Sequence, residues 1–246
     1  MPLWTPHGVV YGIRHKRLFG FLSRAGDVTD AISALDGIAP FPDDSFKRVG
    51  WPNQTTARIA DPEGNLAVDC SIDGLVLTVN VEERPFPADT LRTMFKQLVR
   101  VAFPLYGGDD FVNRIGFVEQ YRFERDAPAK VAVELLTRLG EIGTPGDFKF
   151  RAAFRHSTER GVAMKRVDDW KNTIIEVASE KQGHDTETEG QNILRVSIEH
   201  QIHFVPELEL DLALIDRHYQ DTVEQLVVLQ ETYLAGLAPA NVRDGG

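Results

Sequence analysis

The sequence contains only one cysteine, Cys70, in 246 residues. A single thiol forms no internal disulfide and cannot build a zinc or iron–sulfur site alone, so we expect a reducing compartment. The sequence also has no run of about 18 apolar residues, the length that a membrane-spanning helix needs. Its first four residues carry none of the basic charge of a secretion signal. These absences predict a cytoplasmic protein that binds no membrane.

Glycine-based motifs of three large enzyme classes are missing as well. The chain has no G-x-x-x-x-G-K-[ST] phosphate-binding loop, no G-x-G-x-x-G dinucleotide motif and no G-x-S-x-G nucleophile elbow. We therefore expect no cofactor, and the sequence inclines toward a protein that is not an enzyme.

A metal site is also not expected. The segment 199–203, Glu-His-Gln-Ile-His, is similar in composition to a metal-binding motif. On a strand, however, His200 and His203 are three residues apart and point to opposite faces, so they cannot share one cation.

The charge that is present is acidic. The net charge is −10, and much of the acidic excess lies in 207–231, where Arg217 is the only basic residue apart from a histidine. Because binding to a phosphate backbone needs a basic footprint, nucleic-acid binding is disfavoured. An acidic helix is usually a solvated face, although it can also meet a basic partner.

Hydrophobic periodicity predicts an α+β fold of antiparallel sheets. In the first half it predicts strands over 8–13, 55–59, 66–72, 75–81 and 111–123, with helices over 27–35, where Asp27 is the N-cap, and 87–103. This order, βαββαβ with an extra strand, is that of a ferredoxin-like unit.

The second half reads as βββα. The patterns predict a helix over 128–139, strands near 148–155, 175–177 and 194–204, a mobile polar loop over 181–190, and a long C-terminal helix of roughly 25 to 30 residues after Pro206. We place the halves at 1–126 and 127–246, as two domains or as one compact domain.

The predicted C-terminal helix is apolar on more than one face, because residues 226–229 are all apolar. A single sheet cannot cover all of them. Either other helices of the monomer cover the flanks, or the helix packs on a second copy of the chain or on another protein. The candidate interface residues are Leu226, Val227, Val228, Leu229 and Tyr233.

Two polar residues, Glu119 and His200, interrupt strand faces that are otherwise apolar. A buried carboxylate or imidazole needs a hydrogen-bond partner, so each is either a satisfied core residue or part of a pocket wall. If the two converge, they are candidate acid–base residues of an enzyme.

A basic segment provides candidate anion-binding residues: Arg151, Arg155, Arg160, Lys165 and Arg166. These side chains suit an anionic ligand or RNA. Cross-strand pairing with Glu176, Glu180 and Glu199 explains them more simply. No aromatic residue is predicted among them on the polar face, so we expect no stacking platform for bases.

One strand carries a resemblance to a known family. Residues 112–121, Val-Asn-Arg-Ile-Gly-Phe-Val-Glu-Gln-Tyr, follow the hairpin 69–75 and precede the C-terminal amphipathic helix. This arrangement resembles a sporadically distributed family of uncharacterised prokaryotic proteins of about this length, which carry an R-I-G-L-R-Y-type strand. The second arginine of that pattern is either replaced by Val118 or displaced to Arg122. The resemblance implies a similar architecture and a distribution typical of mobile or defence-associated genes.

The sequence thus favours a protein-interaction component that acts through its acidic, apolar C-terminal helix, as a homodimer or with another protein. The first alternative is a small-ligand binding domain or a metal-independent enzyme with a pocket near Glu119 and His200. The second is RNA binding through Arg151, Arg155 and Arg160.

Overall fold

The protein combines one large antiparallel sheet with helices. The structure, a computed structural model, describes residues 6–107, 111–123, 149–157, 169–182, 191–229 and 231. The elements are β1 (Gly8–Arg14), α1 (Phe21–Ser33), β2 (Arg48–Asn53), β3 (Thr56–Ala60), β4 (Leu66–Ser71), β5 (Gly74–Asn80), α2 (Ala88–Ala102), the 3-10 helix η1 (Phe103–Tyr106), β6 (Phe111–Phe123), β7 (Lys149–Ser157), β8 (Trp170–Gln182), β9 (Gln191–Glu209) and α4 (Leu212–Val228).

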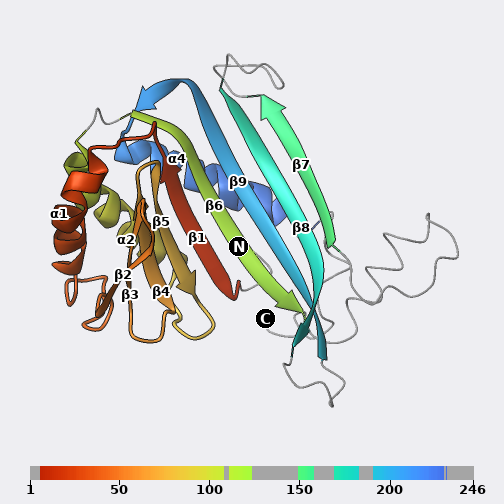
Figure 1. Cartoon of the computed structure of the whole chain (residues 1–246). Coiled ribbons are helices and arrows are strands. Elements are labelled where there is room, and N and C mark those ends of the chain that lie inside the picture. Colours follow the sequence, from red (N-terminus) through yellow and green to blue (C-terminus); the bar gives the residue numbers. More distant parts are fainter. Residues whose placement is uncertain are drawn as a thin grey trace, which may run out of the picture.

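The nine strands form one sheet in the order β2-β3-β4-β5-β1-β6-β9-β8-β7 (Figure 1). Every neighbouring pair is antiparallel. The ferredoxin-like arrangement predicted for the first half is not confirmed, because the sheet has nine strands and continues across both halves of the chain. Strand β1 lies between β5 and β6 and runs antiparallel to both. The mixed α+β class with a large antiparallel sheet is confirmed.

One face of the sheet packs against the helices. Tyr11, Phe117, His200 and Thr173 are register partners across β1, β6, β9 and β8, so they form one row on this face. All four are buried. Helices α1, α2 and α4 contribute buried side chains to the same core as β1 and β6. In Figure 1, α4 passes behind β6 and β9.

The opposite face, here termed the polar face, carries the alternate residues of each strand. Arg14, Arg114, His203 and Trp170 form the corresponding row across β1, β6, β9 and β8. The period of two along each strand therefore gives one apolar side under the helices and one side rich in arginine.

The structure differs from the predictions at three elements. Helix α1 begins at Phe21 rather than at residue 27, because Phe21, Ala25, Val28 and Ile32 form one buried stripe, which overrides the N-cap signal of Asp27. The edge strand β2 was not predicted. The long C-terminal helix is not confirmed, because the described part of α4 has 17 residues.

Other predictions agree or lie outside the described residues. The strand over 111–123 is confirmed with its bounds, and β4 and β5 begin within one residue of prediction. The predicted helix over 128–139, the boundary at 126/127, most of the loop over 181–190 and the segment after 231 lie outside the described residues. Among the helices of the described residues, none is long and apolar enough to cross a membrane.

Candidate functional site

Helix α4 is fixed to the sheet along one stripe. Its first turn is capped by Asp211, whose carboxylate accepts a hydrogen bond from the backbone N–H of Ala213 at 2.9 Å. The buried stripe of α4 consists of residues about one or two turns apart, Ile215, Tyr219 and Leu226, which pack against the sheet. This packing places the C-terminal half of the helix beside β8.

Much of the acidic charge around α4 is used in ion pairs within the chain. Asp216 lies 2.6 Å from the ammonium of Lys96 and 3.3 Å from the guanidinium of Arg92, both on α2. Asp221 pairs with Lys171 of β8. These ion pairs hold α4 against α2 and β8, and they leave less carboxylate charge available to a basic partner than the composition implies.

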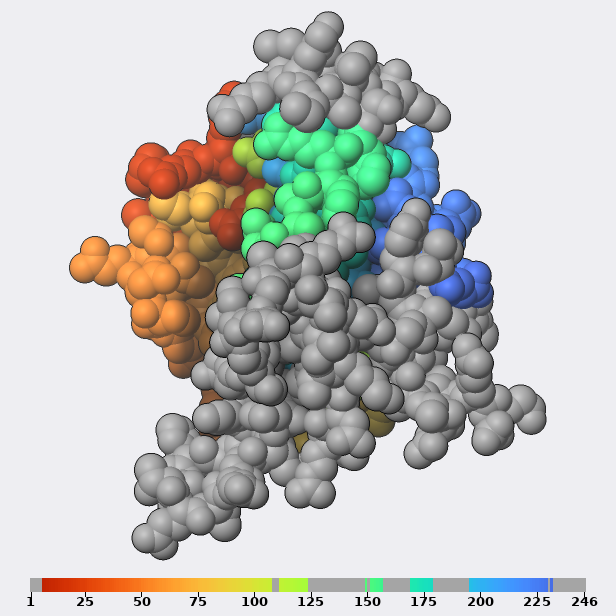
Figure 2. All heavy atoms as spheres, turned by 90° about the vertical axis from the view of Figure 1, so that its right-hand side faces the viewer, coloured from red at the N-terminus to blue at the C-terminus, as the bar shows by residue number. Residues whose placement is uncertain are grey.

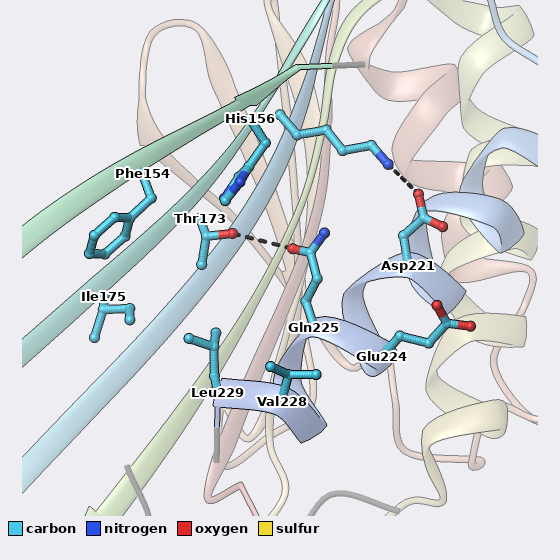
Figure 3. Close-up of a pocket in the computed structure, with 10 residues that line it drawn as sticks. Phe154, His156, Thr173, Ile175, Asp221, Glu224, Gln225, Val228 and Leu229 are labelled. Atoms are coloured by element: carbon cyan, nitrogen blue, oxygen red, sulfur yellow. Dashed lines mark hydrogen bonds and ion pairs between the residues drawn. The ribbon is translucent and has the colours of Figure 1, made fainter. Parts of the chain in front are cut away.

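A cavity of about 800 Å³ lies between α4 and the strands β7 and β8. We name it the α4 pocket. Figure 2 looks onto the edge of the sheet that β7 forms, with α4 beside it, and Figure 3 shows the pocket. Its lining residues are Phe154, His156, Lys171, Thr173, Ile175, Asp221, Glu224, Gln225, Val228 and Leu229.

The α4 pocket has one apolar end and one polar end (Figure 3). Phe154 and Ile175 from the sheet and Val228 and Leu229 from the helix form the apolar end. Phe154 is 50% exposed and Val228 54% exposed, so both side chains remain accessible to a ligand. Large exposed apolar side chains that gather at a concave surface are typical of binding sites.

Two contacts between β8 and α4 form the polar end. The Thr173 hydroxyl donates a hydrogen bond to Oε1 of Gln225 at 3.3 Å, and Lys171 forms an ion pair with Asp221. Lys171 and Asp221 also line a second cavity of about 590 Å³ on their other side. The ion pair therefore stands between two hollows beneath α4.

The predicted site residue His200 is buried directly behind this polar end. Its Nδ1 lies 3.3 Å from the Thr173 hydroxyl, and its Nε2 has no hydrogen-bond partner among the described residues. Burial lowers the pKa of His200 to about 4, so the ring is neutral near pH 7. His218 of α4 is buried nearby, and burial lowers its pKa to about 3. His200 supports the pocket wall without lining the cavity.

The structure does not join Glu119 to His200. Glu119 lies on the same face and accepts a hydrogen bond from the Tyr121 hydroxyl, and burial raises the pKa of its carboxyl. Its register partner is Ile198, whereas His200 is the partner of Phe117. The two titratable groups have separate partners, and neither lines the α4 pocket.

The predicted interface residues of α4 do not share one surface. Leu226 is fully buried in the core with Tyr121 and Val196, so it is not accessible to a partner. Val227 and Leu229 are half-buried, and Val228 is exposed. Tyr233 lies outside the described residues.

The predicted basic residues fall into two groups. Arg151 and Arg155 lie on the polar face of β7, and Arg151 is the register partner of Glu176. Arg160, Lys165 and Arg166 lie outside the described residues. The expectation that no aromatic residue accompanies these cations is wrong, because the Arg155 guanidinium lies 6.0 Å from the centre of the Trp170 ring.

Sequence reasoning missed Lys171, Thr173 and Gln225 as pocket residues. Lys171 and Thr173 share the face of β8 that Ile175 and Val177 continue, so they interrupt an apolar face as His200 does. A polar residue on an otherwise apolar strand face, the pattern that singled out His200, would also have identified Lys171 and Thr173. Gln225 gives no such signal, because only the docking of α4 brings it to β8.

Among the described residues, no three His, Cys, Asp or Glu side chains lie together so that they could hold a metal ion. His200 and His203 lie on opposite faces of β9, as their spacing predicts. Comparison of the chain with protein-family models, with curated proteins and with solved structures found no match. The resemblance suggested by strand 112–121 stays a prediction.

Proposed function

We propose that the protein binds a small amphipathic molecule in the α4 pocket. The observation that supports this is the pocket itself, about 800 Å³ in volume, with an apolar end and a few polar groups at the other end. Small-molecule sites have this size and this division, in which apolar walls provide affinity and a few polar groups orient the ligand.

The charges of the pocket favour a ligand with a neutral or cationic polar head. Lys171 is neutralised by Asp221, and Glu224 forms no ion pair with any described residue. Among the described residues, the lining therefore carries a carboxylate without an ion-pair partner, which repels an anionic head and attracts an ammonium group. The amide of Gln225 and the ring of His156 add hydrogen-bonding groups.

Binding describes this arrangement better than catalysis. A general base must lie within hydrogen-bond reach of the group it acts on. Buried His200 is separated from the cavity by Thr173, with which it shares a hydrogen bond. The proposal therefore assigns His200 to the support of the wall and the lining residues to recognition.

Calorimetric titration with three alkyl probes of equal length tests the proposal. Octylamine, octanol and octanoate share one chain and differ in the head, so each is titrated below its micelle concentration. We expect saturable binding, tightest for octylamine and weakest for octanoate, because the chain fills the apolar end and the head meets Glu224.

A matched pair of variants locates the binding. Val228→Asp places a charge in the apolar end, and Val49→Asp places the same charge on β2, where Val49 is 55% exposed compared with 54% for Val228. Val228→Asp should weaken octanol binding about tenfold or more, as removal of a buried apolar contact does, and Val49→Asp should not. Equal effects of the two variants, or no saturable binding of any probe, would contradict the proposal.

Interaction with another protein through α4 remains a prediction of the sequence. Of the residues named for it, only Val228 is exposed within the described part of the helix. A partner on this helix would therefore cover the mouth of the α4 pocket.

A further inference from the structure

Two arginines lie directly opposite each other on the polar face. Arg14 of β1 and Arg114 of β6 are register partners at the centre of the sheet. Like charges directly opposite each other in a sheet are destabilising unless an anion balances them. Arg14 has such an anion, because its guanidinium donates to Asp73 at 2.8 Å.

Among the described residues, Arg114 has no comparable acidic partner. It is half-buried and forms no ion pair with any described residue. Burial and the neighbouring charge of Arg14 lower the pKa of Arg114, which reflects how poorly its charge is solvated. A half-buried guanidinium keeps its charge, so an anion that reached it would stabilise it.

A cavity of about 570 Å³ opens beside the two arginines. Its lining residues are Arg14, His15, Asp73, Asn113, Arg114, Trp170, His203, Phe204 and Val205. None of them lines the α4 pocket, which lies on the other side of the sheet. We name this cavity the arginine site.

The lining of the arginine site contains two further buried polar groups that have no partner among the described residues. Nε1 of Trp170 and Nε2 of His15 are buried and have no hydrogen-bond partner among the described residues. A buried indole N–H without an acceptor costs free energy that a bound oxygen atom would recover. Trp170 is held in place by its ring stack on His203, at 4.6 Å between ring centres and 9° between planes.

Beside the arginine site, two glycines leave the polar face without side chains. Gly12 and Gly116 are register partners on the same face of the sheet, two residues from the two arginines along β1 and β6. A Cβ built on Gly12 would meet its nearest atom at 3.5 Å and one on Gly116 at 3.6 Å, so the packing of the protein does not require glycine at either position. Glycine within a strand often marks a bulge, a bend or a place where a ligand or another backbone approaches closely, and the space beside these two glycines leaves room for a ligand.

We propose that the arginine site binds the oxyanion group, phosphate or carboxylate, of a small organic anion. The Arg114 guanidinium supplies a planar fork of donors, the indole N–H of Trp170 supplies a single donor, and Arg14 adds charge that Asp73 offsets in part. His203 adds no charge near pH 7, because burial, Arg114 and Arg155 lower its pKa to about 4. The net lining charge is therefore positive, opposite to that of the α4 pocket.

The indole N–H signals of the protein report on this site directly. The chain has three tryptophans, so a ¹⁵N-labelled sample gives three indole signals, and Trp170→Phe identifies the one that matters. Potassium phosphate, sodium acetate and sodium chloride are titrated at equal ionic strength. We expect a saturable downfield shift of the Trp170 signal with phosphate or acetate, because a hydrogen bond to oxygen deshields the proton, and no such shift with chloride.

Variants at two arginines distinguish anion binding at the arginine site from nonspecific electrostatic attraction of anions to the protein. Arg114→Gln should lower the affinity for the anion at least about tenfold, because a charge-assisted hydrogen bond is lost. Arg114→Lys keeps the positive charge but loses the paired N–H donors of the guanidinium, so it should lower the affinity for the anion less. Arg58→Gln is the matched control, because Arg58 lies on the same face of β3 and is paired with Asp69 at 2.6 Å.

The outcomes decide the proposal without reference to the α4 pocket. A saturable shift with phosphate alone or with acetate alone supports the site and identifies its group. Equal shifts with chloride, or affinities in Arg114→Gln and Arg114→Lys equal to those of the wild type, would overturn it. If Arg114→Gln fails to fold, the comparison of Arg114→Lys with Arg58→Gln still decides.

Discussion

The hydroxyl of Thr173 lies 3.3 Å from Oε1 of Gln225, and this contact joins β8 to α4 at the polar end of the α4 pocket. The same hydroxyl lies 3.3 Å from Nδ1 of His200 on β9. One side chain thus links two strands and a helix. The wall of the pocket is positioned by hydrogen bonds from inside the core, while its apolar end stays open to ligands.

Leu226 and Val228 should differ sharply in what they contribute to stability. Leu226 is fully buried, so Leu226→Ala leaves a cavity and should lower the free energy of unfolding by about 3 kcal/mol. Val228 is 54% exposed, so Val228→Ala should change it by less than about 0.5 kcal/mol. Urea denaturation measures both. Equal effects would contradict the placement of α4.

The strands of the sheet could be predicted from the sequence better than their order. Alternation of apolar and polar residues identified β6 with its bounds, because one of its faces packs against helices along most of its length. The pairing of β6 with β9 is a contact between distant segments, and local patterns carry no information about it. Sequence patterns therefore gave no indication that β9 extends the sheet beyond β6.

Two of the buried histidines, His200 and His218, should make the protein less stable in mild acid. Burial lowers the pKa of His200 to about 4 and of His218 to about 3, below their ordinary value of 6.5. As the pH falls from 6.5 toward 4, the unfolded chain takes up protons that the folded chain does not. Stability that is fully present above pH 6.5 is lost over this range, by about 1.4 kcal/mol per pH unit for each histidine.

Replacement of His218 tests this assignment. Its ring stacks on Phe117 with 5.0 Å between centres, so Phe is a suitable replacement. Between pH 6 and pH 5, His218→Phe should reduce the slope of unfolding free energy against pH by about 1.4 kcal/mol per pH unit. Identical slopes for the variant and the wild type would show that His218 does not remain neutral in the folded state.

The single thiol should be unreactive in the native protein. Cys70 is fully buried in β4, and burial raises its pKa to about 12, so almost no thiolate forms at pH 8. Labelling with a chromogenic disulfide reagent should therefore follow global unfolding and rise with urea as the protein denatures. Denatured protein, which should label once per chain, is the control. Stoichiometric labelling within minutes in native buffer would contradict the buried position.

The candidate sites show where sequence reasoning ends. His200 stood out as a polar residue on an apolar face, and it proved to lie beside the α4 pocket. Asp221 looked like part of a solvated acidic face, because nothing in the helix pattern indicates that Lys171 of β8 lies opposite. The arginine site was not predicted, since Arg14 and Arg114 come together only through the pairing of β1 with β6.

Methyl NMR of the full chain during titration with octylamine tests the central claim most directly. If the α4 pocket is the binding site, the first methyl signals to shift are those of Ile175, Val228 and Leu229, which line its apolar end. Signals of Val49 on β2 should stay in place, although that side chain is as exposed as Val228. Shifts that leave the three pocket residues unchanged, or that affect Val49 equally, would contradict a ligand site beneath α4.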